Sequence, residues 1–191
     1  KTLHPSIFGG ILYRRDEAGD VAQATEFGIA PIDLVIVDLY PFEETVLRGG
    51  TEEDIIEKID IGGISLIRGA AKNFADVLIV ASRSQYPALL ELLQSKNSSS
   101  DLPDRKKFAA MAFDVTSHYD TAIFNYFNQE IKFPSFKKSI QQGRTLRYGE
   151  NPHQQGTYYG EFDALFEQLH GKELSYNNLV DVDAAINLVA E

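Results

Sequence analysis

The stretch Asp33-Leu-Val-Ile-Val-Asp-Leu-Tyr40 is rich in β-branched and other apolar residues. Such a run is typical of a strand that is buried on both faces of a parallel sheet. The polar residues Asp38 and Tyr40 come at its C-terminal end, which is where ligands bind in open α/β sheets. The stretch therefore predicts a parallel sheet and indicates the edge of that sheet at which a site lies.

Beyond this stretch, the sequence alternates between helical and strand patterns. Thr51-Glu-Glu-Asp54 has the spacing of a helix capping box, and Asp60-Ile-Gly-Gly63 ends the helix that it starts. Apolar periodicity and capping residues predict helices over residues 51–59, 64–73, 86–94 and 105–128, and a strand over residues 77–81. This βα alternation predicts an α/β fold with a mainly parallel sheet.

A change of composition divides the chain into two predicted domains. The first covers residues 1–130, and residues 131–143 are linker-like in their Pro, Lys and Gly content. Residues 144–191 begin a second domain, with a strand candidate at residues 157–159 and a helix that starts near Asp181. Because the chain begins with Lys1 rather than Met and ends in an unfinished helical pattern, we expect both ends to be cut.

The composition limits the kinds of partner and compartment. The 191 residues carry a formal charge of −10, so the chain should repel nucleic acids and acidic membrane surfaces. It has no cysteine, which excludes disulfides, thiolate nucleophiles and cysteine-ligated metals. No apolar run approaches the roughly 20 residues that span a bilayer, and the first residues lack a secretory pattern. We expect a folded, cytoplasmic protein that binds neither nucleic acid nor membrane.

Three features of the first domain carry groups capable of acid–base chemistry. The glycines of Asp60-Ile-Gly-Gly63 leave helix amides free to bind an anion, although they also suit an ordinary turn. Lys72 either titrates in a buried site or complements the dipole of a helix C-terminus. Tyr40 either directs its hydroxyl into a cleft or packs with that hydroxyl bonded to the backbone.

A further polar cluster, Leu146-Arg-Tyr-Gly-Glu-Asn-Pro-His-Gln154, marks the second segment. Arg147 can hold a phosphate through two hydrogen bonds, and Tyr148 can stack on a heterocycle. The alternative is an ordinary Asn-Pro loop. His4 has no second histidine or carboxylate at ligand spacing, so we predict no catalytic metal.

Taken in order, these clusters resemble one family, the bacterial form of the bifunctional AICAR transformylase/IMP cyclohydrolases of purine biosynthesis. The shared blocks are Lys1-Thr-Leu-His-Pro5, Leu39-Tyr-Pro-Phe42, Asp60-Ile-Gly-Gly63, Ala70-Ala-Lys-Asn73, Leu146 to Gln154, and Gly171-Lys-Glu-Leu-Ser-Tyr-Asn-Asn178 with Asp181-Val-Asp-Ala-Ala185. The blocks cover essentially the whole chain. The resemblance implies that residues 1–130 are a cyclohydrolase domain, incomplete at its N-terminus, and that residues 144–191 open a transformylase domain.

The family's cyclohydrolase closes formyl-AICAR to IMP: the carboxamide nitrogen attacks the formyl carbon, and water leaves. By similarity the catalytic residues are Lys1, Tyr40, Asp60 and Lys72, and the nucleotide-binding residues are Thr2, Asp38, Ile61 and Gly62. Asp60 suits removal of a proton from the nucleophile, while Lys72 and Tyr40 suit donation to the oxyanion and to the departing hydroxyl. Lys1 would neutralise the oxyanion or hold the nucleotide.

The sequence departs from the family pattern at three of its positions. Asp38 stands where the family often has asparagine, and a carboxylate there would alter hydrogen bonding and weaken binding of an anionic ligand. Phe8 and Phe74 replace the more usual histidines. None of the three is among the residues predicted to be catalytic.

The family's transformylase moves a formyl group from its co-substrate 10-formyltetrahydrofolate to AICAR, and Arg147 and Tyr148 are similar to residues that hold AICAR. The ring closure needs no cofactor. The family's transformylase Lys-His block and the phosphate-binding loop of its cyclohydrolase do not occur in these 191 residues. The resemblance also implies a homodimer, and a three-layer α/β/α sandwich similar to methylglyoxal synthase, followed by the start of a second α/β domain.

Two alternatives belong to other classes. One is a non-catalytic module, similar to methylglyoxal synthase, that binds a phosphorylated metabolite, and the other is a structural dimerisation fragment. The joint presence of Lys1, Tyr40, Asp60 and Lys72 favours the enzyme, because binding alone does not require that set.

Overall fold

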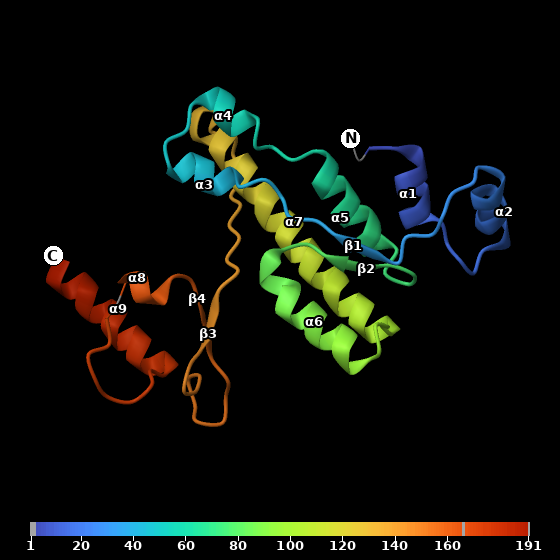
Figure 1. Ribbon diagram of the computed structural model, residues 1–191. Coiled ribbons are helices and arrows are strands. Elements are labelled where there is room, and N and C mark those ends of the chain that lie inside the picture. Colours follow the sequence, from blue (N-terminus) through green and yellow to red (C-terminus); the bar gives the residue numbers. More distant parts are fainter. Residues whose placement is uncertain (1–2, 166, 191) are drawn as a thin grey trace. The chain divides into compact units, whose positions relative to one another are not determined.

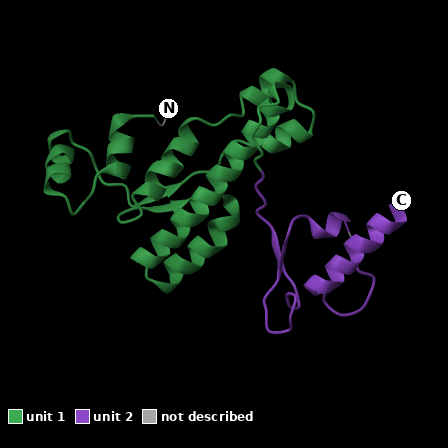
Figure 2. Ribbon diagram, turned by 180° about the vertical axis from the view of Figure 1, so that it is seen from behind, with its two compact units in different colours: residues 1–137 green, residues 138–191 purple. Residues whose placement is uncertain are grey.

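The computed structural model describes residues 3–165 and 167–190, so the predicted site residues Lys1 and Thr2 lie outside the described residues. The chain separates into two compact units, residues 1–137 and residues 138–191 (Figure 2). Their division falls within the predicted linker of residues 131–143. The assignment of the units to cyclohydrolase and transformylase domains stays a prediction. No helix of the described residues is both long and apolar enough to cross a membrane.

Unit 1 contains most of the regular structure, including every helix predicted between residues 51 and 128. Helix α4 ends earlier than predicted, and three short helices before it were not predicted because they are too brief to show apolar periodicity. The order is α1 (Pro5–Leu12), α2 (Ala18–Glu26), β1 (Leu34–Ile36), α3 (Phe42–Leu47), α4 (Glu52–Ile56), α5 (Gly62–Lys72), β2 (Leu78–Val80), a 3₁₀ turn (Arg83–Gln85), α6 (Tyr86–Ser95) and α7 (Leu102–Ile131) (Figure 1).

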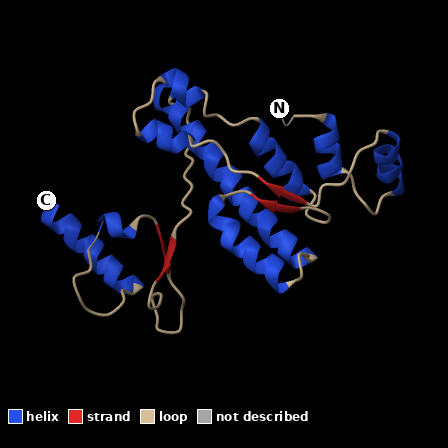
Figure 3. Ribbon diagram, viewed as in Figure 1, coloured by secondary structure: helices blue, strands red, loops and turns tan. Residues whose placement is uncertain are grey.

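The two strands of unit 1 form a parallel pair between helices, which confirms the predicted α/β class (Figure 3). Val35 and Ile79 lie opposite each other and pack with residues of α1 and α5. Leu78 and Val80 point to the other face, where they pack against α6. Helix α7 contributes to both clusters through neighbouring residues, Ala109 to the first and Phe108 to the second.

The prediction that the first strand is buried on both faces is wrong. Val35 is buried, but Leu34 and Ile36 keep 37% and 47% of their surface exposed. These two side chains share a face with Leu78 and Val80, because paired residues of parallel strands point the same way. Helices α6 and α7 cover β2 on that face, and this cover does not extend over β1.

Helix α5 is held to its neighbours by a small apolar face and by polar contacts at its end. Ala70 and Ala71 are fully buried, which allows close approach to the sheet. At its C-terminus the side-chain Nδ2 of Asn73 donates to the carbonyl of Ile11 at 2.8 Å, which ties α5 to α1. Arg105 of α7 donates to the carbonyls of Phe74 and Ala75, and so fixes the turn that leads into β2.

Unit 2 consists of an antiparallel pair, β3 (Gly143–Thr145) with β4 (Thr157–Tyr159), and helices α8 (Phe162–Leu165) and α9 (Tyr176–Ala190). The predicted strand at residues 157–159 is confirmed. The helix expected near Asp181 begins earlier, at Tyr176, because Ser175 and Asn178 form reciprocal hydrogen bonds that start it. No residue of α9 is buried, so unit 2 has no core around this helix.

The first turn of α7 carries an acid-sensitive cap. Asp101 accepts the Asp104 amide at 3.0 Å, and the Lys96 ammonium lies 2.7 Å from the other Asp101 oxygen. The Lys96 hydrogen bond, followed by the Asp104 amide, lowers the pKa of Asp101 to about 2. Because this pKa lies below the ordinary value of 3.8, the stabilisation is complete above about pH 4 and is lost as the pH falls towards about 2.

We therefore expect Asp101→Asn to destabilise the folded chain at pH 7 and to make no difference near pH 2. Asparagine keeps an oxygen that can cap the helix, so the comparison isolates the charge. Urea unfolding followed by circular dichroism at several pH values measures the difference in midpoint. A gap between the two proteins that stays constant from about pH 5 to about pH 2 would contradict the assignment.

Candidate functional site

Four of the candidate residues of unit 1 lie on two loops at one end of the sheet. Asp38 and Tyr40 follow β1, and Asp60 and Ile61 precede α5. Leu39 and Ile59, from these two loops, both pack against one buried cluster, which we call the Tyr119 cluster. It consists of Phe42, Ile55 and Tyr119. The cluster therefore holds the two loops side by side at the C-terminal edge of the strands.

Asp60 is the buried carboxylate of this site, with only 8% of its surface exposed. Its Oδ1 atom accepts the amides of Gly63 at 2.5 Å and of Ile64 at 3.3 Å, both in the first turn of α5. Its own amide donates to the Tyr119 hydroxyl at 2.9 Å. Within the described residues Oδ2 has no hydrogen-bond partner. The carboxylate is thus fixed through one oxygen and has the other available to accept a proton.

Gly63 provides the space that Asp60 occupies. A Cβ atom at this position would lie 2.8 Å from each of the two carboxylate oxygens of Asp60, closer than real Cβ contacts allow. The second glycine of Asp60-Ile-Gly-Gly63 is therefore required by the close approach of a side chain to the helix, and not by a special backbone angle.

Around Asp60 the candidate groups are accessible. Tyr40 has 57% of its surface exposed, Ile61 is also exposed, and Gly62 is half-buried. A buried carboxylate, an exposed phenol on the neighbouring loop and an open helix N-terminus are groups that can bind an anionic ligand and exchange protons with it. These are the residue types that a dehydrative ring closure requires.

Asp38 is already engaged by protein groups. The Tyr86 hydroxyl donates to its Oδ2 atom at 2.7 Å, and Arg83 Nε lies 3.4 Å away. The hydrogen bond to the Asp38 carboxylate raises the pKa of Tyr86. Sequence reasoning missed both partners, although they follow β2 and so belong to the same edge of the sheet as Asp38.

The structure does not bring Lys72 to the other candidates. It is the last residue of α5, whereas Asp60 lies just before the first. An eleven-residue helix extends roughly 15 Å. The C-terminus of α5 leads into the start of β2 (Figure 1), so Lys72, the last residue of α5, lies at the opposite edge of the strands. Its side chain is exposed and makes no hydrogen bond or ion pair with another described residue. Its predicted role rests on the family resemblance alone.

In unit 2 the predicted AICAR-binding pair forms a contact of its own. The Arg147 guanidinium lies 4.8 Å from the centre of the Tyr148 ring and donates to the Tyr148 hydroxyl at 3.2 Å. The Arg147 amide donates to the carbonyl of Leu174, and the Tyr176 amide donates to the carbonyl of Tyr148. This backbone pairing brings together two of the sequence blocks, Leu146 to Gln154 and Gly171 to Asn178.

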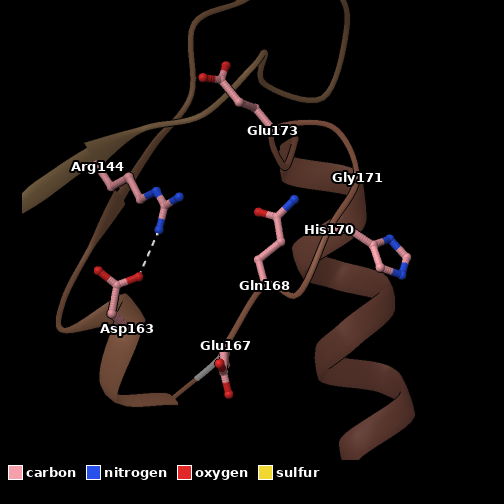
Figure 4. A pocket seen from close by; sticks show the side chains of 7 residues that line it. All are labelled: Arg144, Asp163, Glu167, Gln168, His170, Gly171 and Glu173. Carbon is pink, nitrogen blue, oxygen red and sulfur yellow. Dashed lines mark hydrogen bonds and ion pairs between the residues drawn. The ribbon is translucent and has the colours of Figure 1, made fainter.

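A separate open pocket of about 670 Å³ in unit 2 contains none of the predicted residues (Figure 4). Its only arginine is bound to Asp163 at 3.1 Å, and Glu167 and Glu173 add negative charge, so it does not suit a nucleotide anion. The lining residues are Arg144, Asp163, Glu167, Gln168, His170, Gly171 and Glu173. Across the described parts of both units, no three histidine or acidic side chains gather as a metal ion would require.

Comparison with known proteins decides the family. Residues 70–191 match the family described as AICARFT/IMPCHase bienzyme. The chain belongs to this family. Among AICARFT/IMPCHase relatives, the bifunctional purine biosynthesis protein PurH of Bacteroides thetaiotaomicron is 59% identical over the whole of this chain, which covers 38% of the relative. PurH of Bradyrhizobium diazoefficiens is 46% identical, again with the whole chain aligned to 38% of its length.

One solved structure is similar in fold over part of the chain. The crystal structure of ForH is 32% identical, has a TM-score of 0.56, and covers 67% of this chain and 66% of its own. The chain spans less than half the length of the PurH relatives that it matches. The sequence resemblance to the bifunctional purine enzymes is thereby confirmed, while the roles of individual residues stay predictions.

Proposed function

We propose that the complete protein containing this chain carries out the last two steps of IMP synthesis: transfer of a formyl group from 10-formyltetrahydrofolate to AICAR, then closure of formyl-AICAR to IMP. Residues 1–130 would carry most of the ring-closing domain, and residues 144–191 would open the transformylase domain after a linker at 131–143. The observation that carries the proposal is the buried carboxylate of Asp60, held through one oxygen on a loop that packs against the same cluster as the loop of the exposed Tyr40. The PurH names of the relatives support the same assignment.

In the proposed ring closure the carboxamide nitrogen of formyl-AICAR attacks the formyl carbon. Asp60 Oδ2 takes the proton that this nitrogen loses, and the Tyr40 hydroxyl donates to the oxygen on which negative charge develops. That oxygen takes up two protons and leaves as water, while the formamido nitrogen loses its proton and the C=N bond of the new ring forms. Nucleotide binding is assigned to Thr2, Asp38, Ile61 and Gly62, where the α5 N-terminus favours an anion.

Lys1 and Lys72 complete the proposed catalytic set by similarity. Since Lys72 lies at the far end of α5, a second copy of the chain or a rearrangement has to bring it to the substrate. A homodimer is therefore part of the proposal, as is a cytoplasmic location. Arg147 and Tyr148 are assigned to AICAR, with the guanidinium on a phosphate or carboxamide oxygen and the phenol ring against the heterocycle.

The test uses the protein made from the complete reading frame. Given AICAR with 10-formyltetrahydrofolate, and separately given formyl-AICAR, it should form IMP in both assays, followed by ultraviolet absorbance against reactions without protein. The 191-residue chain, assayed in parallel, measures how much of the ring closure these residues supply. Absence of IMP from formyl-AICAR with the complete protein would overturn the proposal, and the non-catalytic binding module would replace it.

A further inference from the structure

We infer that Tyr119 is a positioning residue of the ring-closure site: its hydroxyl fixes the loop that carries Asp60, and its ring fixes the loop that carries Tyr40. Tyr119 lies on α7, far from both loops in the sequence. The inference rests on the proposed function, because it concerns how that site is held in place.

The hydroxyl of Tyr119 binds two peptide groups of the loop between α4 and α5. It accepts the Asp60 amide at 2.9 Å and donates to the carbonyl of Lys58 at 2.5 Å. These peptide groups flank Ile59, so the one oxygen fixes the path of the chain into Asp60. Tyr119 itself is 6% exposed, which keeps water from replacing either bond.

The ring of Tyr119 reaches the second loop through Phe42. The two rings meet edge to face, with centres 6.1 Å apart, and Phe42 is fully buried. The Phe42 amide in turn donates to the carbonyl of Tyr40 at 2.8 Å. A displacement of Tyr119 therefore moves both loops at once. It also changes the distance between the Asp60 carboxylate and the Tyr40 phenol.

The protonation state of Tyr119 suits this role. Burial raises the pKa of its hydroxyl above the ordinary value of 10, so at neutral pH the proton needed by the Lys58 carbonyl is always present. Without the hydroxyl, the Asp60 amide and the Lys58 carbonyl lose their partner, and the loop has to shift to reach water. A misplacement of about 1 Å is enough to reduce turnover by about a hundredfold.

The same helix offers a matched control in Tyr126. Its ring also meets Phe42 edge to face, at 5.8 Å, but its hydroxyl makes no hydrogen bond with any described residue. Tyr126→Phe and Tyr119→Phe each remove one hydroxyl from the same group of aromatic rings. Only Tyr119→Phe removes hydrogen bonds to the loop that carries Asp60.

The experiment measures ring closure by the complete protein with Tyr119→Phe, Tyr126→Phe, Asp60→Asn and the double variant Tyr119→Phe/Asp60→Asn. Tyr119→Phe should lower kcat about tenfold or more with KM for formyl-AICAR changed less than about twofold, and Tyr126→Phe should keep kcat within about twofold. Because Tyr119 acts through Asp60, adding Tyr119→Phe to Asp60→Asn should lower kcat by less than about twofold. Hydrogen exchange of the peptide over residues 57–64 should become faster in Tyr119→Phe and not in Tyr126→Phe.

Two results would overturn the inference. One is a Tyr119→Phe protein with the kcat of the unmodified enzyme. The other is a Tyr119→Phe change that lowers kcat by the same factor in the Asp60→Asn protein as in the unmodified enzyme, which would make Tyr119 a general structural residue. An Asp60→Asn protein that keeps the unmodified kcat would instead overturn the proposed role of Asp60. The two failures are therefore separate in the same set of measurements.

Discussion

Asp60→Asn in the complete protein should lower kcat for ring closure by at least about a hundredfold, the usual contribution of a general base. Asparagine has nearly the same shape, and its side-chain oxygen can still accept the amides of Gly63 and Ile64. The substitution therefore keeps the start of α5 and removes only the ability to take a proton. The rate of IMP formation from formyl-AICAR measures the effect.

The control for this prediction comes from the other unit. Arg147→Ala should raise KM for AICAR in formyl transfer by about tenfold or more. This is the change in affinity expected from losing a hydrogen bond to a charged group. It should leave the closure of added formyl-AICAR unchanged, just as Asp60→Asn should leave formyl transfer unchanged. If both variants lose both reactions to the same degree, the assignment of one reaction to each unit is wrong.

Gly63→Ala should have an effect of similar size with little loss of stability. The new methyl group would lie 2.8 Å from the Asp60 oxygens, so the carboxylate has to move away from the amides that hold it. A displacement of about 1 Å is expected to reduce kcat about a hundredfold. The folded state should tolerate the change, because alanine favours a helix by up to about 1 kcal/mol over glycine. Turnover and the midpoint of thermal unfolding measure the two effects.

Gly69→Ala provides the comparison on the same helix. A Cβ atom at Gly69 would meet its nearest neighbour, Leu12, at 3.6 Å, which is an ordinary contact. This variant should keep kcat within about twofold, because it lies away from both loops and gains the same helix propensity. Equal losses of activity in the two variants would show that α5 tolerates no added methyl group, and that the contact with Asp60 is not the cause.

Local patterns in the sequence were sufficient to predict the α/β class and the helices α4 to α7, although not the three short helices before them. The apolar periodicity of α5 and α7 and the Thr51 cap appear in the structure, where Thr51 accepts the Asp54 amide. The burial of β1 was not predictable in this way, because it depends on which helices cover each face of the sheet. The distance of Lys72 from Asp60 was predictable, since two residues at opposite ends of one helix cannot meet.

The site itself depends on contacts between distant parts of the sequence, which local patterns do not reveal. Tyr119 occupied an apolar position of a predicted helix, and nothing in its surroundings indicated a hydroxyl bonded to a loop 59 residues away. The hydrogen bond from the Arg147 amide to the Leu174 carbonyl also joins residues that are far apart in the sequence. The resemblance to the family predicted the site residues, and the structure adds the groups that contact Asp60, Asp38 and Arg147.

Helix α7 also restricts how this part of the protein can change in evolution. Ala112 packs in the cluster that contains residues of the sheet, and Tyr119 packs against the two loops. The two residues are about two helical turns apart and lie on the same side of the helix. One residue gained or lost between them would turn Tyr119 by about 100° relative to Ala112. The length of this interval should therefore stay constant among relatives that keep the ring closure, even where the amino acids within it vary.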